Sequence, residues 1–139
     1  MSRYALYPSL RDRVVFVTGG GSGIGASIVE HFCAQGAKVA FVDLAEAPSE
    51  ALVAAIVAEG HPKPLFIGCD LRDIEALRAA VTRTLGELGP VRALVNNAAN
   101  DDRHKALEMT VPYWDDRIQV NLRHQFFAAQ AVIPAMKAA

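Results

Sequence analysis

The stretch that decides the fold is Val14-Val15-Phe16-Val17-Thr18-Gly19-Gly20-Gly21-Ser22-Gly23-Ile24-Gly25. Its β-rich apolar residues predict a strand covered on both faces, and the helical period that follows predicts a helix. Glycines between a strand and a helix permit a tight turn and let the backbone approach a ligand without Cβ collisions. Because the first N–H groups of a helix are free, this segment is suited to hold the phosphates of a dinucleotide.

The glycines of this loop can be aligned in two ways. Gly21-x-Gly23-x-x-Ala26 fits the general dinucleotide fingerprint, whereas Thr18-Gly19-x-x-x-Gly23-x-Gly25 places a glycine directly after the strand. We favour the second alignment for that reason, with the last glycine allowing the helix to pack close to the sheet. A glycine turn without a ligand is the remaining alternative, and a Walker A loop is excluded because no Gly-Lys-Ser/Thr follows.

The same alternation of strand and helix continues along the chain. Short apolar runs predict strands at residues 14–17, 38–42, 64–67 and 92–95. Helical periods predict three helices between them, with Pro48-Ser49-Glu50 starting the second, and a longer fourth helix entered near Pro112 with Asp115 and Asp116 in its first turn. The expected apolar faces are Ile24, Ile28 and Phe32; Leu52, Val53, Ile56 and Val57; Ile74, Leu77, Val81, Leu85 and Leu88; and Trp114, Ile118, Leu122, Phe126, Ala129 and Ile133. Right-handed crossovers then give an α/β fold, a Rossmann-like doubly wound parallel sheet.

Size and composition predict one packed globular domain over residues 1–139. The chain has a mass of 14.9 kDa and is 52% hydrophobic, which excludes disordered and coiled-coil classes. A net charge of −1 from scattered charges excludes nucleic acid as a main partner. The longest apolar run, residues 51–58, is far short of the ~18 residues of a membrane span.

Two further features bear on the compartment and on metals. Residues 1–10 lack a long apolar core and a small-residue cleavage site, so we expect no signal peptide. Cys33 and Cys69 form no C-x-x-C pair and are interpreted as buried thiols in a reducing compartment. We therefore expect a cytoplasmic protein without a metal site.

An acidic residue stands where the second predicted strand ends, roughly twenty residues beyond the glycine loop. Asp43 in Phe41-Val42-Asp43-Leu44 is placed to accept hydrogen bonds from the adenosine ribose. Its carboxylate would repel a 2′-phosphate by about 1 to 4 kcal/mol at ~4 Å. The sequence therefore predicts NAD rather than NADP as the cofactor, the alternative being that Asp43 is an ordinary turn residue.

The third and fourth predicted strands also end in polar residues, at Asp70-Leu71 and at Asn96-Asn97-Ala98-Ala99. Ligands of open parallel sheets lie beyond the carboxyl ends of the strands, so all four strand ends point to one site. Singly, Asp70 could equally cap the next helix, and Asn96 could equally bind backbone.

Together these residues resemble the short-chain dehydrogenase/reductase family over nearly the whole chain, with Val120-Asn121-Leu122 on the fourth helix as a further match. Ala99 stands where the family usually has glycine. The resemblance implies a catalytic-relay role for Asn121, although an asparagine at the edge of the core and satisfied by backbone is an equal alternative from the residues alone. The cofactor-binding residues expected are Thr18, Gly19, Ser22, Gly23, Ile24, Gly25, Asp43, Leu44, Asp70, Leu71, Asn97 and Ala98.

Two other stretches, residues 100–104 and 113–124, resemble bacterial dehydrogenases of this family that act on aldoses such as xylose, arabinose or galactose. The resemblance implies an alcohol or sugar substrate. An equal alternative is that residues 101–104 form a solvated loop and that Arg117, Arg123 and His124 lie on a helix surface facing solvent or another subunit. His104 is not favoured as a general base, because a lone loop histidine is more often structural or exposed.

The family's chemistry implies a Ser and a Tyr-x-x-x-Lys segment, and none of Tyr4, Tyr7 and Tyr113 is followed by Lys four residues on. We therefore expect the chain to be the N-terminal, cofactor-binding part of an NAD-dependent dehydrogenase, truncated after the helix that follows the fourth strand and inactive by itself. Unprotected Leu94 and Val95 at a sheet edge support this expectation. The alternatives are a non-catalytic dinucleotide-binding module and a remnant that acts only in oligomer contacts. A homo-oligomer, dimer or tetramer, is expected.

Overall fold

The computed structural model describes residues 5–139 and shows one parallel sheet with the strand order β3-β2-β1-β4. Residues 1–4, which include Tyr4 and part of the stretch examined for a signal peptide, lie outside the described residues. The strands are β1 (Val14–Thr18), β2 (Lys38–Asp43), β3 (Leu65–Gly68) and β4 (Val91–Asn96). All four predicted strands are confirmed, within one residue at each end.

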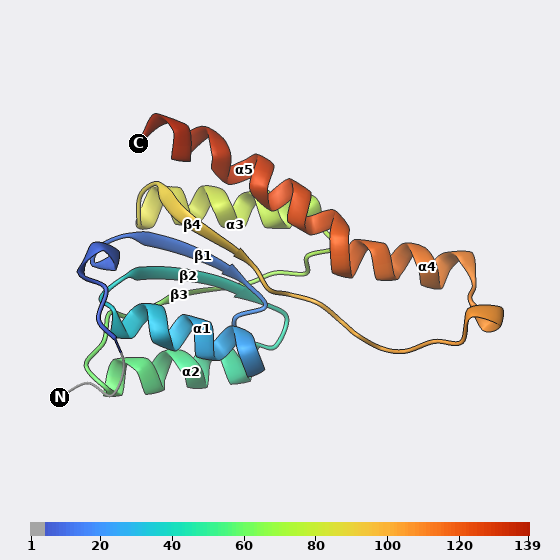
Figure 1. Cartoon of the computed structure of the whole chain (residues 1–139), viewed down its shortest axis with the longest axis horizontal. Coiled ribbons are helices and arrows are strands. Elements are labelled where there is room, and N and C mark those ends of the chain that lie inside the picture. Colours follow the sequence, from blue (N-terminus) through green and yellow to red (C-terminus); the bar gives the residue numbers. More distant parts are fainter. Residues whose placement is uncertain (1–4) are drawn as a thin grey trace.

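Helices cover both faces of the sheet (Figure 1). The helical elements of the described residues, including those away from the sheet, are η1 (Pro8–Leu10), α1 (Gly23–Ala34), α2 (Glu46–Ala58), α3 (Ile74–Glu87), η2 (Ala106–Glu108), α4 (Val111–Ile118), the π turn η3 (Gln119–Arg123) and α5 (His124–Ala138). Successive residues of β1 enter opposite cores: Val15 and Val17 pack with α1 and α2, whereas Val14 and Phe16 pack with α3 and α5. The Rossmann-like doubly wound fold is therefore confirmed.

Helix α2 begins at Glu46 rather than at the predicted Pro48-Ser49-Glu50. Proline is tolerated in the first turn of a helix, because N–H groups there have no partner within the helix. Ser49 also turns inward, where its fully buried hydroxyl donates to the carbonyl of Ala45 at 2.6 Å. A residue that is usually a start signal thus lies inside the helix.

The predicted apolar face of α1 is confirmed at Ile28 and Phe32, which pack against the core, and was wrong at Ile24. Gly25, Val29 and Cys33 are buried, whereas Ile24 is 77% exposed. The physical reason is the close approach of the helix at Gly25, where an added Cβ would overlap the carbonyl oxygen of Gly19. The helix therefore turns Gly25, which has no side chain, toward the end of the strand.

The long fourth helix departs furthest from its prediction. It begins at Val111, capped by Thr110, whose Oγ1 accepts from the N–H of Tyr113 at 3.3 Å, so Asp115 and Asp116 lie beyond its first turn. The predicted apolar face is largely exposed, at 57% for Trp114 and 66% for Phe126. Helix α4 extends beyond the sheet (Figure 1), so the sheet does not cover its apolar side chains. On α5 the buried residues are instead His124, Ala128 and Val132.

Both cysteines are buried, as predicted, and burial raises the pKa of Cys33 to about 12. Among residues 5–139, no helix is long and apolar enough to cross a membrane. The same residues contain no group of three or more His, Cys, Asp or Glu side chains placed to hold a metal ion.

Candidate functional site

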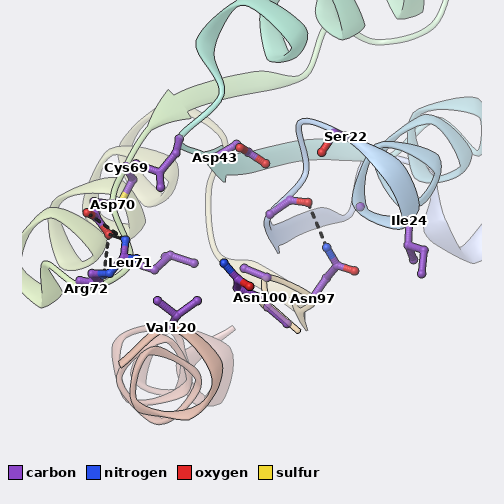
Figure 2. Close-up of a pocket in the computed structure, with 15 residues that line it drawn as sticks. Ser22, Ile24, Asp43, Cys69, Asp70, Leu71, Arg72, Asn97, Asn100 and Val120 are labelled. Carbon is purple, nitrogen blue, oxygen red and sulfur yellow. Dashed lines mark hydrogen bonds and ion pairs between the residues drawn. The ribbon is translucent and has the colours of Figure 1, made fainter. Parts of the chain in front are cut away.

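A cavity of about 480 Å³ opens at the carboxyl ends of the four strands (Figure 2). Each strand end contributes to its wall, as predicted for a ligand site in an open parallel sheet. The lining residues are Gly19, Ser22, Ile24, Gly25, Asp43, Leu44, Cys69, Asp70, Leu71, Arg72, Asn97, Ala98, Ala99, Asn100 and Val120. Of the predicted site residues, Thr18, Gly23 and Asn121 do not line the cavity.

The glycine loop between β1 and α1 is held tightly against its neighbours. The N–H groups of Gly19 and Gly20 donate to the carbonyl of Val42 at 2.8 and 3.2 Å. Gly19 has φ +67°, and an added Cβ there would lie 2.8 Å from Cα of Ala98. Only a residue without a side chain accommodates both the left-handed backbone and this approach.

Asn97 fixes the same loop from β4. Its Nδ2 donates to the carbonyl of Thr18 at 3.1 Å and to the carbonyl of Gly19 at 3.0 Å, and Figure 2 shows the second of these bonds. A Cβ added at Gly25 would lie 2.6 Å from this Nδ2 as well as overlapping the Gly19 carbonyl. Glycine spacing and the Asn97 amide therefore build one tightly packed loop, which agrees with the alignment that ends at Gly25.

Thr18 shapes the site from behind. Its side chain is fully buried, and Oγ1 accepts from the N–H groups of Asn97 and Ala98, both at 3.1 Å. These bonds join the end of β1 to the segment that follows β4. The hydroxyl thus orders two walls of the cavity without lining it.

Asp43 is fixed by two backbone donors. Its Oδ2 accepts from the N–H of Gly21 at 2.9 Å, and its Oδ1 accepts from the N–H of Ala45 at 2.8 Å. The half-buried carboxylate is therefore part of the turn into α2 and part of the cavity wall at once. Each oxygen keeps capacity to accept a further hydrogen bond.

Asp70 is not the cap of α3, because Asp73 holds that position and its Oδ1 accepts from the N–H of Ala76 at 3.0 Å. Asp70 instead accepts from the N–H of Arg72 at 2.9 Å. The Arg72 guanidinium lines the cavity and also reaches across to α4, where its Nε donates to Asp116 at 2.7 Å.

Asp116 joins this group to Arg117, whose Nη2 donates to its second carboxylate oxygen. Arg117 and Arg72 lower the pKa of Asp116 through these hydrogen bonds. Arg117 is 18% exposed and lies 3.6 Å from Asp102. The alternative of a solvated Arg117 was therefore wrong, as it was for His124, which is fully buried.

Asn121 is held by backbone atoms on both ends of its amide. Its Oδ1 accepts from the N–H of Asn100 at 2.7 Å, and its Nδ2 donates to the carbonyl of Asn100 at 3.0 Å. The neighbouring Val120 and Asn100 line the cavity. Asn121 thus clamps the loop after β4 beside the cavity.

The polar loop at residues 101–104 is exposed and lies outside the cavity lining. The ring of His104 stacks on Tyr113 at a centroid distance of 4.3 Å. The Arg117 guanidinium lies over the same Tyr113 ring, 5.1 Å from its centroid.

Sequence reasoning missed Arg72 and Val120 as lining residues. Arg72 directly follows the predicted pair Asp70-Leu71, and that adjacency was a usable signal. Cys69 also lines the cavity, and its pKa is raised to about 11 by burial first and then by Asp70 and Asp73. A protonated thiol at that wall is a small apolar contact.

Comparison with known proteins identifies the family of this chain. The family model described as short chain dehydrogenase matches residues 13–139. The chain is 54% identical over 131 residues to a probable galactose dehydrogenase of Rhizobium meliloti, covering 94% of this chain and 51% of that protein. It is 50% identical over 133 residues to a D-xylose 1-dehydrogenase of Caulobacter vibrioides, covering 96% and 52%. The chain spans about half the length of the curated relatives it matches.

Solved structures lead to the same family. A short-chain dehydrogenase/reductase from Serratia marcescens superposes with a TM-score of 0.88 at 37% identity, covering 94% of this chain and 53% of that one. A blue fluorescent protein from a metagenomic library, solved in complex with NADPH, superposes with a TM-score of 0.84 at 36% identity, covering 91% and 52%. The glycine loop, the aligned strand ends and these matches together identify the chain as a member of the short-chain dehydrogenase family.

Proposed function

We propose that the cavity binds NAD and that this chain supplies the cofactor-binding part of an NAD-dependent dehydrogenase acting on an aldose sugar. The observation that carries the cofactor choice is Asp43, a carboxylate held in the cavity wall by the N–H groups of Gly21 and Ala45. Its free acceptor sites suit ribose hydroxyls, whereas its charge opposes a 2′-phosphate.

The chain's own residues fit such a cofactor. A Cβ at Gly19 or Gly25 would collide with neighbouring atoms, so glycine at both positions allows the loop to pack closely beside the cavity. Ser22 and Ile24 lie at the start of α1, whose N-terminal N–H groups favour a pyrophosphate. The same proposal gives contacts along the cavity to Leu44, Asp70, Leu71, Asn97 and Ala98, whereas Gly23 contributes through the backbone of the loop.

The sugar substrate is inferred from the relatives, which include a probable galactose dehydrogenase and a D-xylose 1-dehydrogenase. In the proposed reaction a CH–OH carbon is oxidised, its hydride passes to NAD and its hydroxyl proton passes to a base. Asn121 serves the proton relay by holding the loop at Asn100. The serine, tyrosine and lysine of the proton transfer are not among residues 5–139 in the required pattern, and we propose that another part of the protein supplies them. The protein is proposed to be a cytoplasmic homo-oligomer.

The test is a calorimetric titration of the chain and of an Asp43→Ala variant with NAD and with NADP. We expect the wild-type chain to bind NAD more tightly, and the variant to lose most of that preference because the ribose acceptor and the repulsive charge disappear together. Equal weakening for both cofactors would contradict the ribose role. Binding of NAD without turnover by the longer protein would favour the non-catalytic module.

A further inference from the structure

Two side chains close the π turn between α4 and α5. In an α-helix, each carbonyl accepts from the backbone N–H four residues later. Here the side chains of those same residues also donate: Nε2 of His124 to the carbonyl of Val120 at 2.8 Å, and Nε2 of Gln125 to the carbonyl of Asn121 at 2.9 Å. A π turn widens the helix, and side chains that insert into the backbone hydrogen-bond ladder are a recognised cause of distortion in helices.

The burial of His124 settles which ring nitrogen carries its hydrogen. The side chain is fully buried, and burial lowers its pKa, so the ring is neutral at neutral pH. A neutral imidazole has one N–H, and the carbonyl of Val120 requires it on Nε2. Within residues 5–139, Nδ1 has no hydrogen-bond partner. The bond to Val120 is therefore the hydrogen bond that the ring donates, and the backbone of Ala98, which lines the cavity, also interacts with the ring.

Two consecutive residues connect the turn to the cavity, one directly and one through Asn100. Val120 lines the cavity, and its side chain points into it (Figure 2). Asn121 grips the backbone of Asn100, which lines the same cavity. A return of the turn to regular α-helical geometry would rotate these two residues relative to α5, whose own position is fixed by Ala128 and Val132 in the core.

We propose that His124 and Gln125 are positioning residues that hold the π turn open and thereby keep Val120 and Asn121 in place beside the cavity. Neither touches the cavity itself. The proposal rests on the proposed function in one respect, because it takes the cavity to be the NAD site.

The test compares four variants of the chain. His124→Phe keeps the ring and removes the donor, and Gln125→Met keeps the length and removes the amide. His124→Gln is the conservative variant, because Gln125 shows that a glutamine in this helix reaches the carbonyl four residues earlier. Gln130→Met, at an exposed position of α5, is the matched control.

The first readout is hydrogen exchange of the Asn100 amide, followed by NMR without any cofactor. That N–H is bonded to Asn121, so we expect its exchange to rise at least about fivefold in His124→Phe and Gln125→Met, the loss typical of one hydrogen bond. His124→Gln restores protection, and Gln130→Met changes nothing. The amide of Ala76, which donates to the distant cap Asp73, reports general loosening and stays unchanged.

The second readout is the dissociation constant for NAD, which we expect to rise several-fold in the same two variants. Unchanged Asn100 exchange in folded Gln125→Met and His124→Phe would overturn the proposal, and so would faster exchange with an unchanged NAD affinity. If His124→Phe fails to fold, the half-buried Gln125 carries the test. A wild-type chain that does not bind NAD refutes the proposed function, whereas the exchange data still decide whether these residues hold the turn.

Discussion

Replacing Gly25 by alanine tests the packing of the glycine loop, and Gly86 provides the matched comparison. Both glycines lie inside helices, Gly25 in α1 and Gly86 in α3. A Cβ at Gly25 would overlap the Gly19 carbonyl oxygen and lie 2.6 Å from Nδ2 of Asn97, whereas a Cβ at Gly86 meets no atom within 4 Å. The two substitutions are chemically identical and differ only in what surrounds them.

The expected energies follow from that difference. Alanine is favoured over glycine inside a helix by about 1 kcal/mol, so Gly86→Ala is expected to stabilise the chain by up to about that amount. At Gly25 the same gain is opposed by overpacking, which costs about 1 to 3 kcal/mol in ordinary cores and reaches the top of that range against rigid backbone. We expect a net destabilisation of about 2 kcal/mol.

Urea unfolding followed by circular dichroism measures both changes, and titration with NAD adds the functional consequence. Displacing the Gly19 carbonyl also breaks the bonds from Asn97, so Gly25→Ala is expected to lose NAD binding while Gly86→Ala retains it. If Gly25→Ala gained stability as Gly86→Ala does, or bound NAD normally, the close packing described for this loop would be refuted.

Three further results are expected. Asn97→Ala removes two hydrogen bonds to the loop and should lower the free energy of unfolding by about 2 kcal/mol in urea, with no loss contradicting the anchor role. The pKa of His124 is lower in the folded than in the unfolded chain, so the unfolded chain binds the extra proton and stability falls as the pH drops below about 6.5. The free energy of unfolding should therefore decline more steeply from pH 7 to pH 5 in the wild type than in His124→Phe. Equal slopes would argue against a buried neutral ring. Burial raises the thiol pKa values of Cys33 and Cys69 to about 12 and about 11, so at pH 7.5 a thiol reagent should label them only after unfolding, and rapid labelling of the native chain would contradict their burial.

The order of the elements could be predicted from sequence because each depends on local patterns. The run at residues 14–17 is apolar throughout, and the structure buries it on both faces of the sheet. The glycine alignment that ends at Gly25 could also be predicted, because a glycine directly after a strand permits the tight turn into the helix. Asp43 lies at the cavity as expected for the end of the second strand, and its contact with a ribose stays a prediction.

Other features depend on contacts that a local pattern does not contain. Periodicity identified an apolar stripe through Trp114 and Phe126, but the face that packs on the sheet is set by where α5 crosses α3 and β4. The bond from Arg72 to Asp116 joins residues 44 positions apart, so no spacing rule predicts it. The π turn carries two side-chain bonds within its own helix, from His124 and Gln125, but histidine and glutamine at this spacing are common in regular helices, so the sequence pattern did not reveal it.

Parallel titrations of the chain with NAD and with NADP test the central claim most directly. The account predicts that NAD binds and raises the melting temperature, and that NADP binds at least about tenfold more weakly, because Asp43 stands where a 2′-phosphate would be repelled. Failure of both cofactors to bind, or tighter binding of NADP than of NAD, would contradict it.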